Sequence, residues 1–376
     1  MFINNIENTL MEMKLDKNVQ YAIAFSGGVD SVVLNHVLTT LGYSVIPLMF
    51  NHKLRTESDY EEEYFKNNIP NIIVGHWDSP TKSELDARNA RYNFFDKTMD
   101  KLGIETLFVG HHGNDRAEEF LKRVVTGTTI SGIFGMKKLS FDNLLDDKLI
   151  IRPMLGVLKK DIYSYAETNN LVWFEDKTNA GKDFTRNRFR NEYIPMLEKE
   201  NVNTVEHVVN ISDELEDVYD FLNEYVNEKY SKNIKKTIFN QNYLPISLFK
   251  NEKNIIKKEL LKKFINESTE DNKAISKKLF NDYLEFICNS EVNKLFGIKS
   301  GFNFLIDSID GELVVIIIDS NVDCSDYFPN SEKGKGKDKF GSVKLKEFYR
   351  LNKIPYYIRQ QQLVYKENEI IFDVVK

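Results

Sequence analysis

Cysteine is nearly absent from this sequence, which has only Cys288 and Cys324 in 376 residues. No C-x-x-C pair occurs, so neither a thiolate zinc site nor an iron–sulfur cluster is expected. Two cysteines also exclude a disulfide framework, and we therefore expect a cytosolic protein.

Long apolar runs and an excess of positive charge are absent as well. The N-terminal segment is amphipathic without a signal-peptide core, and the longest apolar run, Leu313–Ile318, fits a buried strand better than a membrane span. A net charge of −6 excludes a uniformly basic nucleic-acid-binding coat. It leaves room for local basic patches, because phosphate binding depends on where lysines and arginines lie.

The first half of the sequence alternates short apolar runs with helical patterns. This alternation predicts an α/β fold, a parallel sheet with helices on both faces. From about residue 201 the pattern becomes helical, and beyond residue 290 it is strand-rich, with a hairpin turning at Asp310-Gly311. The polar, Gly/Lys-rich segment 330–342 is expected to be a mobile loop. We predict three domains: an α/β domain 1–200, a helical domain 201–290 and a small α+β domain 291–376. The strands expected in the first are 21–25, 45–50, 71–74 and 106–109, and the helices 31–41, 59–67, 83–102 and 115–125.

The sharpest motif is Ser26-Gly27-Gly28-Val29-Asp30-Ser31, between a predicted strand and a predicted helix. Glycines let a backbone approach a ligand closely, and a helix start offers N–H groups and a positive dipole end to an anion. A carboxylate at Asp30 would repel phosphates unless Mg²⁺ bridged them. The alternative interpretation is a turn that only caps a helix, since Asp and Ser favour such positions.

This string resembles the SGGxDS signature of the PP-loop ATP pyrophosphatases, whose domain is similar to the adenine nucleotide alpha hydrolases. Further strings, in the same order and spacing, resemble one family of that class, the bacterial tRNA(Ile)-lysidine synthetases. They are Asn51–Arg55 with Glu57–Asp59, Ala87–Tyr92 with Phe94-Phe95, His111–Glu118, Arg152-Pro153 through Trp173 and Glu175-Asp176 to Phe184–Arg190, and, near the C-terminus, Lys344–Lys346 through Ile354-Pro355 and Arg359. The resemblance covers nearly the whole chain and is strongest over residues 20–200.

The resemblance has departures. The family usually reads H-H-x-D-D-Q-A-E-T, whereas here Asn114 and Arg116 replace the first Asp and the Gln, and Glu119 replaces the Thr. Asn114 lacks the charge of a metal-binding carboxylate. We therefore hypothesise that Arg116 offsets the loss by gripping an ATP or tRNA phosphate. The competing interpretation is an inactive or altered enzyme.

The resemblance and the chemistry together give the candidate site. The catalytic residues are expected to be Asp30, Arg91, His112, Asp115 and Arg186. The ATP-binding residues are expected to be Ser26, Gly27, Gly28, Val29, Asp30, Ser31 and His111, with Mg²⁺ on Asp30 and Asp115. The nucleic-acid contacts are expected to be Arg88, Arg116, Arg188, Arg190, Lys344 and Lys346. Asp115, His112 and Glu118 are all candidates to deprotonate lysine.

Each assignment has a simpler alternative. Arg88 and Arg91, three residues apart on one helix, fit surface ion pairs, and the two histidines could be structural. Trp173 is expected in the core. Arg186, Arg188 and Arg190 could form a solvated face, and most exposed lysine runs do. The resemblance also implies that the helical and C-terminal domains hold the tRNA body by phosphate contacts and shape, and lysine-rich clusters fit that role. These clusters are Lys137-Lys138, Lys159-Lys160, Lys257-Lys258, Lys262-Lys263 and Lys333–Lys339.

The resemblance implies a ligase that uses ATP and Mg²⁺ to attach free L-lysine to C2 of the wobble cytidine of tRNA(Ile) with a CAU anticodon. An adenylated cytidine is the implied intermediate. No membrane partner is expected, and a homodimer stays an alternative because the sequence does not fix the oligomeric state. The rival functions are another PP-loop enzyme, such as a tRNA thiolase or an amidotransferase synthetase, and a non-catalytic tRNA-binding protein. Thiolases usually need paired cysteines, which this chain lacks.

Overall fold

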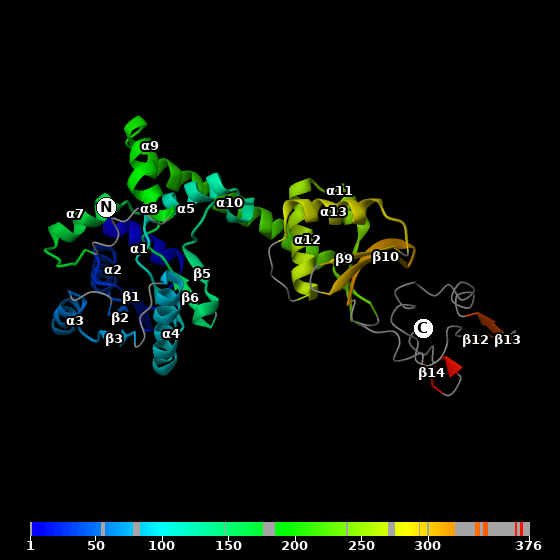
Figure 1. Cartoon of the computed structure of the whole chain (residues 1–376), viewed down its shortest axis with the longest axis horizontal. Helices are drawn as coiled ribbons and strands as arrows, with labels where there is room; N and C mark the ends of the chain where they lie inside the picture. The colour runs from blue at the N-terminus through cyan, green and yellow to red at the C-terminus, as the bar shows by residue number, and fades with distance from the viewer. Residues whose placement is uncertain are drawn as a thin grey trace. The chain divides into compact units, whose positions relative to one another are not determined.

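The computed structural model describes most of the first 319 residues and a few short strands beyond them. The described ranges are 2–53, 57–77, 83–146, 148–175, 185–237, 240–269, 275–292, 294–298, 301–319, 335–338, 341–344, 365–366 and 369–370. The chain divides into two compact units, Met1–Tyr219 and Asp220–Lys376 (Figure 1). Among the described residues, no helix has both the length and the apolarity needed to cross a membrane.

Unit 1 is built on a six-stranded sheet in the order β3-β2-β1-β4-β6-β5, in which only β5 is antiparallel to its neighbour. This confirms the predicted parallel α/β fold. The strands are β1 (Gln20–Phe25), β2 (Ser44–Asn51), β3 (Ile73–His76), β4 (Thr106–Phe108), β5 (Leu139–Phe141) and β6 (Leu149–Ile151).

Helices cover both faces of this sheet. They are α1 (Phe2–Glu12), α2 (Val29–Thr40), α3 (Glu57–Asn68), α4 (Glu84–Leu102), α5 (Gly113–Thr126), α6 (Ile130–Ile133), η1 (Asn143–Leu145), α7 (Lys159–Thr168), α8 (Thr185–Arg188), the π-helical turn η3 (Phe189–Tyr193), α9 (Ile194–Glu200) and the first part of α10 (Thr204–Asn233). Figure 1 shows α2 and α4 on opposite sides of β1 and β2.

Strand β1 is buried on both faces, which explains why its apolar run is continuous. Tyr21 and Ile23 pack into the core that contains α1, α2 and α7, whereas Ala22 packs into the core formed with α4. Successive side chains of a strand point to opposite faces, so a strand covered on both sides is apolar at every position. The order of the strands places β2 and β4 on either side of β1. This is the switch point outside which parallel sheets bind ligands.

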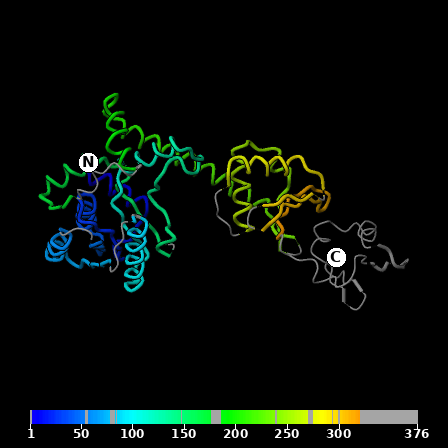
Figure 2. Tube along the Cα trace, in the orientation of Figure 1, coloured from blue at the N-terminus to red at the C-terminus, as the bar shows by residue number. Residues whose placement is uncertain are grey.

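Unit 2 combines helices with an antiparallel sheet. Its helices are α11 (Ile246–Asn251), α12 (Asn254–Thr269) and α13 (Lys277–Asn289), and its sheet has the order β7 (Lys235–Lys236), β8 (Asn242–Pro245), β11 (Glu312–Asp319), β10 (Phe302–Ile309) and β9 (Lys294–Ile298). Figure 2 shows the β10–β11 hairpin in orange beside the yellow helices. Asp310 and Gly311 turn it with φ of 52° and 83°, as a two-residue hairpin loop requires, so the predicted turn is confirmed.

The helices of unit 2 share one core with the hairpin. Leu260, Phe264 and Tyr283 pack with Phe304 and Val315. The predicted boundary at residue 290 falls inside this core, and the boundary near 200 lies before α10, which runs into unit 2. The division into three domains stays a prediction. The expectation of a loop over 330–342 is wrong where the structure describes it, because β12 (Lys335–Asp338) pairs with β13 (Gly341–Lys344). The remaining described strands are β14 (Tyr365–Lys366) and β15 (Glu369–Ile370).

Candidate active site

The turn between β1 and α2 depends on Gly27. Its φ of 81° is in the left-handed region, and a Cβ there would lie 2.5 Å from the Phe65 ring. Any side chain at this position would therefore strain the backbone and collide with α3. Gly28 then starts α2 with an extended conformation.

The two serines of the turn hold its shape. The Ser31 hydroxyl accepts a hydrogen bond from the Ser26 N–H at 3.1 Å and donates to the Gly28 carbonyl at 3.0 Å. The Ser26 hydroxyl accepts from the Gly28 N–H at 3.3 Å. The first N–H groups of a helix lack partners within the helix, so Val29 and Asp30 present a cradle for an anion.

Asp30 faces a cation that the sequence analysis did not assign to the site. The Lys159 ammonium donates to both carboxylate oxygens of Asp30, at 2.7 and 2.8 Å. Lys159 is the first residue of α7, and its N–H donates to the Asn114 side-chain oxygen at 2.9 Å. These contacts join the starts of α2, α5 and α7.

The loop after β4 lies directly against the phosphate turn. A Cβ on Gly110 would meet the Asp30 backbone at 3.2 Å. The buried His112 follows it, with Nε2 lying 3.6 Å from an Asp30 oxygen and 3.4 Å from an Asp115 oxygen. Carboxylates from two separate motifs, Asp30 and Asp115, therefore meet at one imidazole nitrogen.

Two arginines and two carboxylates form a compact network beside His112. Arg186 donates to Asp115 at 2.7 Å and to Glu118 at 3.0 Å, and Arg190 donates to the same residues at 2.9 and 2.6 Å. The arginines are four residues apart on one helical segment and the acids three apart on α5, so each pair shares a helix face. The acids are almost fully buried and the arginines only partly buried. Arg186 and Arg190 therefore contact buried carboxylates instead of forming a solvated face, and their catalytic and nucleic-acid roles stay predictions.

The charges in this network control protonation. Burial raises the pKa of Asp115, but the adjacent His112, His111 and Arg186 and the N–H of His112 lower it further, to about 2. The charge of Arg186 and the hydrogen bond from the His112 N–H still lower the pKa of Asp115 when both histidines are neutral. Burial lowers the pKa of His112 despite the nearby Asp115 and Asp30, so His112 is neutral at pH 7. Its Nδ1 is buried without a hydrogen-bond partner.

The neighbouring His111 is fixed by Arg152. The Arg152 Nε donates to His111 Nδ1 at 3.1 Å, which leaves the ring proton on Nε2. Burial lowers the pKa of His111 to about 4, with Arg152 among the contributing charges. His111 is therefore a neutral hydrogen-bond donor at physiological pH.

Arg116 forms buried ion pairs inside unit 1. Its side chain is fully buried, and its guanidinium donates to Asp213 and, at 2.8 Å, to Glu216, both on α10. The hypothesis that Arg116 grips a phosphate is therefore corrected, because a guanidinium enclosed between two carboxylates has no access to a ligand. Asn114 also has a structural contact, to the start of α7. The two departures from the family pattern do not compensate each other by contact with the same group.

The other predicted residues lie around the site or outside the described parts. Arg88 pairs with Asp142 at 3.0 Å and stacks on Tyr92 at 4.6 Å, and Arg91 lies 5.8 Å from the same ring. The Lys344 backbone belongs to β13, and Lys346 lies outside the described residues. Trp173 is partly buried in the core, as predicted.

Two site residues were missed by the sequence analysis. Arg152 belongs to a quoted motif, and Lys159 to a lysine cluster that fitted either tRNA phosphate contacts or a solvated surface. The signal that could have found Lys159 is its position, since a lysine at the first residue of a helix opposes the helix dipole.

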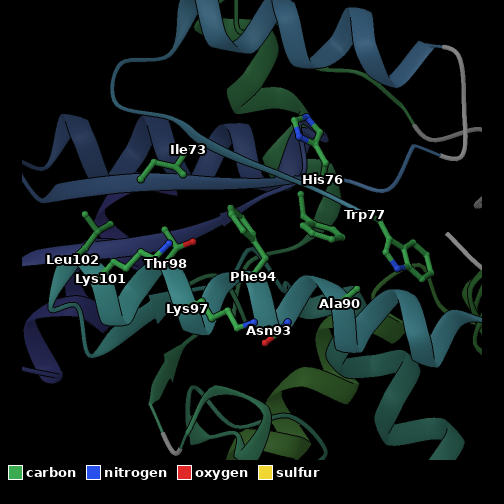
Figure 3. A pocket seen from close by; sticks show the side chains of 11 residues that line it. Ile73, His76, Trp77, Ala90, Asn93, Phe94, Lys97, Thr98, Lys101 and Leu102 are labelled. Carbon is green, nitrogen blue, oxygen red and sulfur yellow. The ribbon is translucent and has the colours of Figure 1, made fainter. Parts of the chain in front are cut away.

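A hollow of about 630 Å³ lies elsewhere in unit 1, between α4 and strands β2 and β3 (Figure 3). Phe50 and Phe94 line it, and Trp77 lies at one end (Figure 3). None of the predicted site residues lines this hollow, so it is separate from the candidate site.

The donor set at the phosphate turn suits Mg²⁺ shared with a substrate. Mg²⁺ usually takes one or two carboxylates and completes its shell with phosphate oxygens and water. Asp30 and Asp115 supply two carboxylates around His112. Within the described ranges, no group of three or more His, Cys, Asp or Glu side chains is arranged to hold a metal.

Comparison with known proteins shows which family and which relatives the sequence matches. The PP-loop domain family matches residues 2–197. A tRNA(Ile)-lysidine synthase of Enterococcus faecalis is 30% identical over 226 residues, which cover 57% of this chain and 48% of that protein. One of Streptococcus agalactiae is 34% identical over 223 residues, covering 56% and 50%. Among solved structures, the U34-tRNA thiolase NcsA of Methanococcus maripaludis is similar with a TM-score of 0.47 and 16% identity, covering 57% of this chain and 76% of that one.

The chain spans about half the length of the curated relatives that it matches. The matched family covers more than half of the chain itself, including the phosphate turn and the histidine loop. The chain therefore belongs to the PP-loop domain family of ATP-binding proteins.

Proposed function

We propose that this chain is an ATP-dependent ligase that attaches free L-lysine to C2 of the wobble cytidine of tRNA(Ile) with a CAU anticodon, giving lysidine. One observation carries the proposal: the phosphate turn, the His111–Glu118 segment and Arg186 with Arg190 meet outside the ends of β1 and β4. The similarity to proteins named tRNA(Ile)-lysidine synthase supports it.

In the proposed first step, the cytosine O2 attacks the α-phosphorus of ATP, and the bond to the bridging oxygen breaks so that pyrophosphate leaves. Negative charge grows on the leaving group, and preorganised donors lower that barrier. The N–H groups at the start of α2, the Nε2–H of His111 and the partly exposed Arg186 and Arg190 supply these donors. Mg²⁺, held by Asp30 and Asp115, would neutralise phosphate charge when bound.

In the proposed second step, the ε-amine of lysine attacks C2 and the C2–O bond breaks, releasing AMP with that oxygen. The amine has an ordinary pKa of about 10.4, so it must lose a proton. Asp115, with a pKa of about 2, is a weak base, and both Glu118 oxygens accept from the arginines. His112 is neutral and its Nε2 lies between Asp30 and Asp115, so we assign proton acceptance to His112.

The test is mass spectrometry of nucleosides after incubation of the protein with tRNA(Ile) CAU transcript, ATP, Mg²⁺ and lysine. Lysidine should form only with all four, and a transcript with uridine at the wobble position should give none. His112→Asn should slow lysidine formation while tRNA-dependent pyrophosphate release continues. The matched control is His207→Asn, an exposed histidine on α10. Absence of lysidine with wild-type protein would reject the proposal, and pyrophosphate release without lysidine would favour a different adenylating enzyme.

A further inference from the structure

Lys159 is placed unusually for a surface lysine. It is the first residue of α7, where a positive charge opposes the positive end of the helix dipole. Its ammonium also lies at the start of α2, next to a second positive helix end, through its contact with Asp30. The two positive helix ends disfavour a cation here and the Asp30 carboxylate offsets them, whereas a bound polyanion would attract the ammonium more strongly.

The contacts of Lys159 hold the ammonium at the phosphate turn. The main chain is fixed by Asn114, and the ammonium lies 5.1 Å from the Tyr163 ring. Because the Lys159 and Asp30 side chains are 28% and 30% exposed, water screens their ion pair. Such pairs are typically worth about 1 kcal/mol or less, so the ammonium can exchange this partner easily for a more highly charged one.

We propose that Lys159 is a triphosphate-binding residue of the ATP site, with Asp30 as its partner when no nucleotide is bound. In the nucleotide complex the ammonium contacts the phosphates at the turn, and the Asp30 carboxylate becomes available to a cation. A compact ammonium on a flexible stem suits this exchange better than a rigid guanidinium. The inference rests on ATP binding at the turn and is independent of which substrate is adenylated.

The experiment is calorimetric titration of the whole chain with three ligands: a non-hydrolysable ATP analogue, pyrophosphate and AMP. A charge-assisted hydrogen bond is worth about 1.5–3 kcal/mol. Lys159→Gln should therefore lower the affinity for the ATP analogue and for pyrophosphate roughly tenfold or more. AMP lacks the outer phosphates, so the same substitution should lower the affinity for AMP by less than about threefold. Lys160→Gln, at the adjacent exposed lysine, should match the wild type. Lys159→Arg, which keeps the charge, should fall between wild type and Lys159→Gln.

A double variant separates phosphate binding from simple neutralisation of Asp30. The comparison is made in Mg²⁺-free buffer, so that the loss of the Asp30 carboxylate as a cation ligand does not enter. If Lys159 only neutralises Asp30, then Lys159→Gln combined with Asp30→Asn should recover wild-type affinity for pyrophosphate under these conditions, and the proposal would be overturned. If Lys159 binds phosphate, the double variant stays weak. The proposal would also be overturned if Lys159→Gln and Lys160→Gln bound pyrophosphate with equal affinity. It would likewise be overturned if Lys159→Gln lost as much affinity for AMP as for the ATP analogue. These titrations contain neither tRNA nor lysine, so failure here leaves the lysidine assay unaffected, and failure there leaves these results standing.

Discussion

The buried Arg116 offers the clearest energetic test of this structure. Replacing Arg116 with methionine keeps much of the side-chain volume but leaves the carboxylates of Asp213 and Glu216 without their shared cation. We expect unit 1 to lose stability because two like charges then face each other beside an apolar residue.

The structure sets the size of this loss. Breaking a buried ion pair by removing one partner usually costs about 3–5 kcal/mol. The Asp213 side chain is 39% exposed and can regain water, whereas Glu216 is only 16% exposed. We therefore expect the lower end, about 3 kcal/mol, equivalent to a fall of roughly 6–12 °C in Tm for a unit of this size.

Urea unfolding followed by tryptophan fluorescence measures this loss selectively. Both tryptophans of the chain, Trp77 and Trp173, belong to unit 1. Lys122→Gln is the matched control on the same helix, because its partly exposed pair with Glu119 should contribute less than about 1 kcal/mol. Adding Glu216→Met to Arg116→Met should recover a large part of the loss. An Arg116→Met protein within about 1 kcal/mol of wild type would refute the reasoning.

Three further variants test the site. Gly27→Ala should weaken nucleotide binding roughly tenfold or more and destabilise unit 1, because of its φ of 81° and the ring 2.5 Å from the new Cβ, whereas Gly156→Ala, with open space around it, should not. The pKa of Asp115 is lowered to about 2, so its stabilisation of roughly 2 kcal/mol is complete above its unfolded pKa near 4 and is lost as the pH falls through 2. Asp115→Asn should make the unfolding free energy less dependent on pH between about 4 and 2. An acid transition that is unchanged by this substitution would contradict the assignment. Asn114→Asp should keep the hydrogen bond to the N–H at the start of α7 and fold normally, whereas Asn114→Ala should lose about 1 kcal/mol in urea unfolding.

The sequence determined the alternation of strands and helices from β1 to α5, because its signals are local, but it did not show β5 and β6. Short continuous apolar runs such as 21–25 favour strands buried on both faces, and the predicted strands and helices are found within a few residues of their expected ends. The turn Ser26–Ser31 and the hairpin at Asp310-Gly311 could also be predicted from the sequence, because glycine and aspartate tolerate the positive φ that these turns require. The strands around residues 335–344 were missed because glycine and lysine are poor strand formers, so only pairing reveals them.

Only the tertiary structure decided which charges meet. Lys159 and Asp30 are 129 residues apart, and Arg186 and Asp115 are 71 apart, so no local pattern relates them. The sequence could name Arg116 as a cation but could not show that α10 encloses it. A charge acts over a few ångströms through its burial and its partners, and these depend on how distant segments pack. Helix and strand signals are carried by neighbouring residues, whereas the protonation and accessibility of this site are properties of the folded chain.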